Sequence, residues 1–133
     1  MWCHFPFLLE AKTATEPGPQ PMPMPMPALV VGVRTFEDGV TINVAYATTQ
    51  RTSSLRSGEF LISKDKHPVA FKQAGLAFDT KFDLNKVLEF PWTDRYFKVP
   101  PTPNPAFGQT PKMGSLHASM MRALVAAHEA TGR

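Results

Sequence analysis

Apolar and polar residues alternate most regularly in the first half of the chain, on both sides of one turn. Residues 28–33 form a short, almost unbroken apolar run, which is typical of a strand buried on both faces. Residues 40–47 carry valine, isoleucine or tyrosine at every second position, which is typical of a strand buried on one face. Asp38 and Gly39 favour a hairpin turn between them, because glycine accepts the positive φ that such a turn needs. The pattern therefore predicts a central antiparallel hairpin.

Shorter patterns outside the hairpin predict further strands and one short helix. The predicted strands cover residues 2–9, 59–63, 76–84, 87–90 and 95–99. The helix is expected just before residue 76, since Asp65 or His67 can cap its first amides and Pro68 suits its first turn. Gly75 suits the left-handed position that follows the end of a helix.

Two proline-rich segments interrupt these patterns. Residues 10–26 end in an alternation of methionine and proline, and we expect a loop there because repeated proline interrupts helices and sheet ladders. The alternative is a proline-rich ligand for another domain, although methionine is an unusual residue in such ligands. Residues 100–114 are expected to be irregular, and residues 115–130 place leucine, methionine and alanine at helical spacing, which predicts a C-terminal helix.

Short strands with one internal helix and one terminal helix indicate a small, mainly β barrel of the α+β class. The chain has 133 residues, which is enough for one domain with its own core. We expect the barrel in residues 1–99, and the irregular segment with the C-terminal helix in residues 100–133.

Composition and charge narrow the function only slightly. Lysine and arginine total 14 against 11 acidic residues, and a net charge of +3 permits nucleic acid or an acidic partner without selecting either. The single cysteine, Cys3, excludes an internal disulfide framework and favours a reducing compartment. The first residues lack a signal-peptide pattern, and no apolar run approaches the roughly 20 residues of a membrane helix. We therefore expect a soluble, cytoplasmic protein with no membrane partner.

Several common catalytic motifs are absent from the sequence. It contains no glycine-rich phosphate loop, no pair of histidines at metal-ligand spacing and no Gly-x-Ser-x-Gly sequence. The four histidines are scattered, which is more typical of surface or capping residues than of ligands. We therefore expect neither a metal nor a cofactor.

Candidate catalytic residues gather at the ends of predicted strands. Thr48, Thr49 and Gln50 close the hairpin, and Asp79 and Lys81 lie two residues apart on one face of a later strand. If these ends meet, hydroxyls, a carboxylate and an ammonium group surround one point. Such a set can cleave RNA by attack of the ribose 2′-hydroxyl on its own phosphate, which needs a base, stabilisation of the phosphorane and an acid, but no metal. The alternative is an ordinary strand end with a solvated Asp–Lys pair.

Strict alternation conflicts with one part of this site. It places Thr48 on the buried face with Val44 and Tyr46, and Thr49 on the polar face. Either the strand ends or bulges before Thr48, or Thr49 is the exposed member of the pair.

Three segments together carry a resemblance to a known family. Pro-Ala-Leu-Val-Val at residues 27–31, followed by Val-Ala-Tyr-Ala-Thr-Thr-Gln at residues 44–50, resembles the PemK, MazF and Kid toxins of type II toxin–antitoxin systems. Gly-Leu-Ala-Phe-Asp at residues 75–79 is similar to a later segment of that family, and residues 2–6 and 17–19 are similar to its PemK-like subgroup. The resemblance covers residues 2–99. It implies a dimeric SH3-like barrel of the MazF/Kid/CcdB type and a metal-independent endoribonuclease that cuts single-stranded RNA and is neutralised by a cognate antitoxin.

The resemblance also implies roles for particular residues. Thr48 is expected to contact the scissile phosphate, and Asp79 to act as the base or as an orienting group. Beyond what the resemblance implies, the residues expected to bind the substrate are Thr49, Gln50, Lys81, Arg34 and Arg51. Lys81 matches no catalytic position of the family, and Lys81, Arg34 and Arg51 are candidates to replace a missing family cation from elsewhere in the chain.

Two departures from the family pattern concern its arginines. Met26 stands where the family has an arginine before its Pro-Ala strand, and Ala77 stands at a second arginine position. Loss of one such donor typically costs on the order of 100- to 1,000-fold in rate. The alternative function is therefore a catalytically impaired homologue that binds RNA or an antitoxin. A gyrase-poisoning relative with the same barrel is a third alternative.

Overall fold

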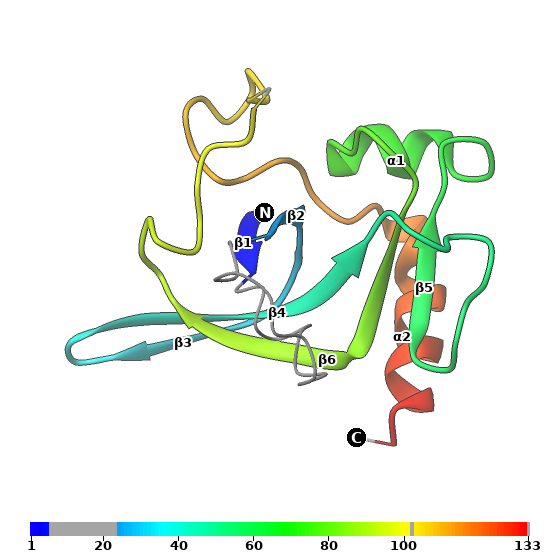
Figure 1. Ribbon diagram of the computed structural model, residues 1–133, viewed down its shortest axis with the longest axis horizontal. Helices are drawn as coiled ribbons and strands as arrows, with labels where there is room; N and C mark the ends of the chain where they lie inside the picture. The colour runs from blue at the N-terminus through cyan, green and yellow to red at the C-terminus, as the bar shows by residue number, and fades with distance from the viewer. Residues whose placement is uncertain (6–23, 102, 133) are drawn as a thin grey trace, which may run out of the picture.

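The computed structural model describes residues 1–5, 24–101 and 103–132 (Figure 1). The elements in this part of the chain are β1 (Trp2–Phe5), β2 (Met24–Pro27), β3 (Leu29–Phe36), β4 (Gly39–Thr48), β5 (Glu59–Ile62), α1 (Pro68–Ala74), β6 (Thr80–Pro91), a 3₁₀ turn (Ala118–Met120) and α2 (Met121–Ala130). β1 and β2 form one antiparallel sheet, and a second antiparallel sheet has the strand order β3-β4-β6-β5. The four-stranded sheet curls into a half-barrel (Figure 1), so the predicted mainly β, α+β class is confirmed.

The predicted central hairpin is present as β3 and β4, but the burial of its two strands is the reverse of the prediction. In β3, which is an edge strand of its sheet, Val31 and Val33 are 44% and 59% exposed. In β4, the consecutive residues 44–47 are all buried. β4 lies between β3 and β6 and is covered on both faces, so its small Ala45 and Ala47 are as inaccessible as its larger neighbours.

The two strands predicted at 76–84 and 87–90 are one long bent strand, β6. Tyr46 of β4 lies opposite Asp83, whereas the adjacent Ala45 lies opposite Val87, so residues 84–86 bulge out of the ladder. A bulge bends its strand and increases the local twist. β6 turns there in Figure 1, and this turn produces the curl of the sheet. Residues 76–79 precede β6 and are not part of a strand, so that portion of the prediction is wrong.

The end of the methionine–proline run is a strand, β2, which corrects the expectation of a loop. It pairs with β1 in antiparallel register from Trp2 opposite Pro27 to Phe5 opposite Met24. In a strand, the backbone N–H groups of alternate residues point to the same edge. Prolines at every second position therefore remove N–H groups from one edge only, and the methionine N–H groups on the other edge remain for pairing. The remainder of the predicted first strand and of the loop lies in residues 6–23, outside the described residues.

Two other elements differ from the predictions, and α1 is bounded only partly as expected. Residues 95–99 are not a strand, and Phe97 makes a single bridge to Cys3. α2 begins at Met121 after the 3₁₀ turn, later than expected. Gly75 has the predicted left-handed φ of 73°. Neither predicted cap of α1 forms, since the Nδ1 atom of His67 instead accepts a hydrogen bond of 3.0 Å from the backbone N–H of Ser63.

The core consists of two clusters on opposite faces of the four-stranded sheet. One contains Phe60, Ile62 and Phe82 together with residues of α1 and α2. The other contains Val44 and Phe90 together with residues of β1 and of the segment after β6. The helices therefore cover one face, and the small sheet covers the other. No helix in the described part of the chain is long and apolar enough to cross a membrane.

Candidate functional site

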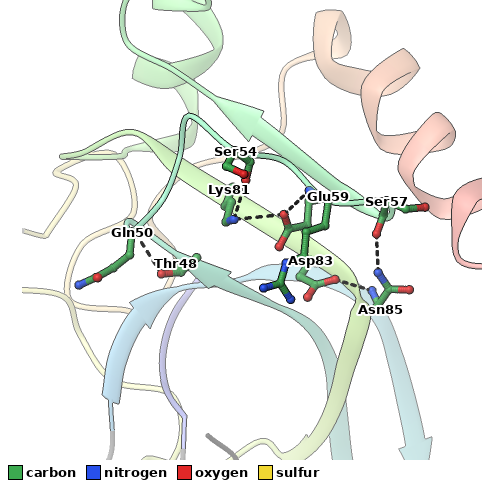
Figure 2. A network of polar contacts seen from close by, with 9 residues as sticks. Thr48, Gln50, Ser54, Ser57, Glu59, Lys81, Asp83 and Asn85 are labelled. Carbon is green, nitrogen blue, oxygen red and sulfur yellow. Dashed lines mark hydrogen bonds and ion pairs between the residues drawn. The ribbon is translucent and has the colours of Figure 1, made fainter.

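Thr48 is the last residue of β4 and is half-buried. Its Oγ1 atom accepts a hydrogen bond of 3.1 Å from the backbone N–H of Gln50 (Figure 2). This hydrogen bond closes a turn through the threonine side chain, and the turn directs the chain away from the sheet. A hydroxyl that accepts one hydrogen bond keeps its own proton for donation. Thr48 can therefore still donate to an anionic oxygen at the strand end.

The conflict over alternation at this strand end has a structural answer. β4 extends to Thr48, and the irregularity lies opposite, in the bulge of β6. Thr49 follows the strand and is exposed, whereas Thr48 is partly covered. Thr49 is thus the exposed member of the pair, which is one of the two alternatives that the pattern left open.

Thr49 and Asp79 line the same open recess, which has a volume of about 490 Å³. The residues around it come from the end of β4, the segment before α1, α1 itself and the turn before β6: Thr49, Lys64, Phe71, Ala77, Phe78 and Asp79. The Oδ1 atom of Asp79 accepts a hydrogen bond of 2.8 Å from the backbone N–H of Lys64. This bond fixes the orientation of the carboxylate and joins two of the segments. The recess therefore combines a hydroxyl, a carboxylate, an ammonium group and exposed aromatic surface.

Lys81 does not line this recess. It lies opposite Thr48 in the pairing of β4 with β6, but its side chain is only 7% exposed. Its Nζ atom is 3.1 Å from Glu59 Oε1 and donates a hydrogen bond of 3.0 Å to the Ser54 carbonyl, and Figure 2 shows the ammonium group directed to these two partners. Asp79 precedes β6 while Lys81 is within it, so the expected shared strand face does not form. Lys81 instead fastens the loop before β5 to the sheet.

The same loop is held at a second point by the bulge of β6. Asn85 donates from Nδ2 to the Ser57 carbonyl at 2.7 Å, and its backbone N–H donates to Asp83 Oδ1 at 2.9 Å (Figure 2). The segment that follows Thr48 is therefore anchored by polar contacts near its end, and these anchors limit how far it can move relative to the recess.

The two predicted arginines occupy different places. Arg34 is in β3, 3.4 Å from Glu89 and over the ring of Phe36. It lies opposite Thr41, seven residues along β4 from Thr48, which is about 23 Å at roughly 3.3 Å per residue. Arg34 is therefore remote from the recess within one chain.

Arg51 lies much closer to the strand end. It is exposed and follows Gln50 directly, with a φ of 51°. A non-glycine residue in this left-handed region is uncommon and costs of order 1–3 kcal/mol. Arg51 is the predicted arginine whose position in the chain lets it approach the recess.

Met26 lies in β2 opposite Cys3 and packs against the core cluster of Val44 and Phe90. The position therefore supplies apolar contact and no charge. No local sequence pattern indicates Lys64 or Phe78 as site residues, because none shows that the segment before α1 meets the turn before β6. The proximity of Phe78 to Asp79 in the chain was the one signal that could have indicated it.

Among the described residues, no group of three or more histidine, cysteine, aspartate or glutamate side chains could hold a metal ion. No protein-family model and no curated protein matches this chain. The class of protein that the fold defines is thus a small, mainly β domain of α+β type, with a mixed polar and aromatic recess at one end of its curled sheet.

Proposed function

We propose that this chain is an endoribonuclease of the PemK, MazF and Kid toxin family, with the SH3-like barrel of the MazF/Kid/CcdB type. It cleaves single-stranded RNA without a metal in the cytoplasm, and a cognate antitoxin neutralises it. The curled antiparallel sheet is compatible with such a barrel. The observation that carries the proposal is the convergence of Thr49 and Asp79 on one recess with Lys64.

Each group has a chemical role in this proposal. The Asp79 carboxylate accepts the proton of the ribose 2′-hydroxyl, whose oxygen forms a bond to the adjacent phosphorus. The Lys64 ammonium and the Thr49 hydroxyl stabilise the negative charge of the phosphorane. Thr48 is not among the residues that line the recess, and its hydroxyl contributes only if the phosphate extends to the end of β4. The bond from phosphorus to the 5′-oxygen then breaks, and this oxygen receives a proton from a cationic side chain, Lys64 or Arg51. The products are a 2′,3′-cyclic phosphate and a 5′-hydroxyl end.

The test is incubation of the purified protein with a long single-stranded RNA in the presence of EDTA, followed by mapping of the fragment ends. Discrete cuts with 5′-hydroxyl ends, absent with Asp79→Asn, are the expected result. Asp94→Asn is a matched control, because Asp94 is an exposed carboxylate outside the recess. Intact RNA after incubation with the folded wild type would contradict the nuclease proposal.

A catalytically impaired homologue is the second candidate function. Two observations favour it: Met26 packs against an apolar cluster, and Lys81 is paired with Glu59 in a buried ion pair. Neither position then supplies the cation that the family arginines provide. This candidate predicts that the chain binds RNA or an antitoxin with no cleavage, so a binding assay beside the cleavage assay distinguishes the two functions.

We also propose that the protein is a homodimer. A groove of about 560 Å³ between β3 and α2 is lined mainly by apolar residues, including the half-exposed Val31 and Val125. Contiguous exposed apolar surface of this kind often marks an interaction site. A second copy of the chain is the partner that the resemblance suggests for it.

A further inference from the structure

Phe78 is the most exposed of the large hydrophobic residues that the structure describes, at 70%. It lies directly before Asp79 and lines the same recess. We propose that the Phe78 ring is a stacking platform for one nucleobase of single-stranded RNA, next to the phosphate held by Thr49 and Lys64. The inference rests on the proposed RNA-binding function and adds the residue that holds a base.

Two contacts just after the ring in the chain hold the backbone that carries it. The Phe78 carbonyl accepts a hydrogen bond of 2.8 Å from Thr80 Oγ1, at the start of β6. The neighbouring Asp79 is tied to the backbone of Lys64 at 2.8 Å. An aromatic side chain has few rotatable bonds, so a ring on a fixed backbone loses little conformational freedom when a base stacks on it.

The surroundings of the ring favour nucleic acid over an apolar protein partner. Lys64 and Phe71 also line a neighbouring recess, whose wall includes the exposed Lys72 of α1. The two recesses therefore share a wall that contains Lys64, with Lys72 in one recess and the Phe78 ring in the other. Proteins that bind single strands combine a cationic groove for the backbone with aromatic side chains for the bases. The Phe78 recess has a volume of about 490 Å³ and is open to solvent, so a base can reach the exposed ring.

The test measures the dissociation constant of a fluorescein-labelled ten-nucleotide RNA of mixed sequence, 2′-O-methylated throughout so that it cannot be cleaved. Phe78→Ala is expected to weaken binding by about fivefold to 150-fold, the range that loss of one stacked base gives. Phe78→Trp should restore or strengthen binding, since indole also stacks. Phe36→Ala is the matched control, because Phe36 is an exposed ring in the hairpin, away from the recess. Thermal unfolding of each variant checks its fold.

Salt dependence separates stacking from charge. Lys64→Gln should reduce the slope of log affinity against log salt by about 0.7, because one phosphate contact is lost. Phe78→Ala should leave this slope unchanged, since stacking releases no counterions.

The outcomes separate this inference from the function on which it rests. If the wild type binds no RNA, both the proposed function and the stacking platform are overturned. If the wild type binds RNA and Phe78→Ala binds it equally well, only the platform is overturned. Weakened binding of a protein partner with unchanged RNA binding would assign the ring to a protein contact instead, and would also overturn the inference.

Discussion

The carboxylate of Asp79 is hydrogen-bonded to the backbone of Lys64, 15 residues earlier in the chain, at 2.8 Å. The bond brings the turn before β6 to the segment before α1, and the two residues then line one recess. Asp79 therefore has two possible roles: it orders two segments of backbone, and it presents a carboxylate to whatever the recess binds. Experiments on this residue have to separate the two roles.

The two roles of Asp79 predict different effects for two substitutions. Asp79→Asn keeps an acceptor oxygen for the Lys64 N–H, so we expect an unchanged fold and loss of RNA cleavage. Asp79→Ala removes the acceptor as well and should lower the free energy of unfolding by about 1 kcal/mol. Urea denaturation measures the stability, and end-mapped cleavage measures the activity. Full cleavage by Asp79→Asn would contradict the role of this carboxylate as the base.

The side chains of Lys81 and Glu59 are both more than nine-tenths buried, and Lys81 Nζ lies 3.1 Å from Glu59 Oε1. Removal of one partner leaves an uncompensated buried charge, so Lys81→Met should destabilise the protein by about 3–5 kcal/mol. The double variant Lys81→Met with Glu59→Leu should recover much of this loss, because no isolated charge remains. A double-mutant cycle in urea measures both effects. An unchanged stability in Lys81→Met would contradict the structural role of the pair.

Burial raises the pKa of the Cys3 thiol from its ordinary value of 9.0 to about 12. Between these values the unfolded chain has lost the thiol proton while the folded chain keeps it. The stability that Cys3 contributes is therefore fully present below pH 9, and it falls by about 1.4 kcal/mol per pH unit above pH 9. Stability profiles between pH 8 and 10.5 should diverge between the wild type and Cys3→Ala, whose profile lacks this fall. Parallel profiles would contradict the assignment.

The sequence predicted which strands and helices form better than it predicted how deeply each one is buried. The hairpin and the left-handed Gly75 follow from local patterns, and the structure contains both. Burial of β3 and β4 could not be read locally, because it depends on which strand is outermost in the sheet. The pattern of β6 was divided into two strands because the residues of its bulge break the alternation.

The candidate site was predictable only in part, for a related reason. Thr48 and Thr49 were both expected to approach Asp79; Thr49 and Asp79 line one recess, whereas Thr48 is not among its lining residues. Lys81 was expected beside them from its spacing alone. In the structure its ammonium group forms a buried ion pair with Glu59 of β5, which is two strands away from Thr48 in the sheet order. Such a partner belongs to tertiary structure, and local spacing carries no information about it.

The groove between β3 and α2 gives a prediction about assembly. If a second copy covers this groove, Val31→Lys places a charge in an apolar interface, and we expect the variant to sediment as a monomer where the wild type sediments as a dimer. Val69→Lys is the matched control, since Val69 is exposed on α1 and lies outside the groove. Sedimentation velocity over a range of concentrations measures the change. A wild type that stays monomeric at all concentrations would contradict the dimer.

Met26→Arg tests whether the missing family arginine limits activity. Met26 is partly buried against the cluster of Val44 and Phe90, but it lies in a two-stranded sheet, from which a long side chain can extend its charged end to solvent. If that end reaches the bound phosphate, the cleavage rate should rise by about 100- to 1,000-fold, the range attributed to one such donor. Met26→Lys should give a smaller increase, because an ammonium group lacks the bidentate geometry of guanidinium.

Met26→Leu is the control for packing at this position and should leave the rate unchanged. A folded Met26→Arg variant that cleaves no faster than Met26→Leu would mean that β2 does not place this side chain at the phosphate. Arg51 would then be the remaining arginine near the strand end, since Arg34 lies at the far end of the hairpin. Loss of the residual rate in Arg51→Gln, with the fold kept, would assign the cationic role to Arg51 and identify the turn after β4 as its source.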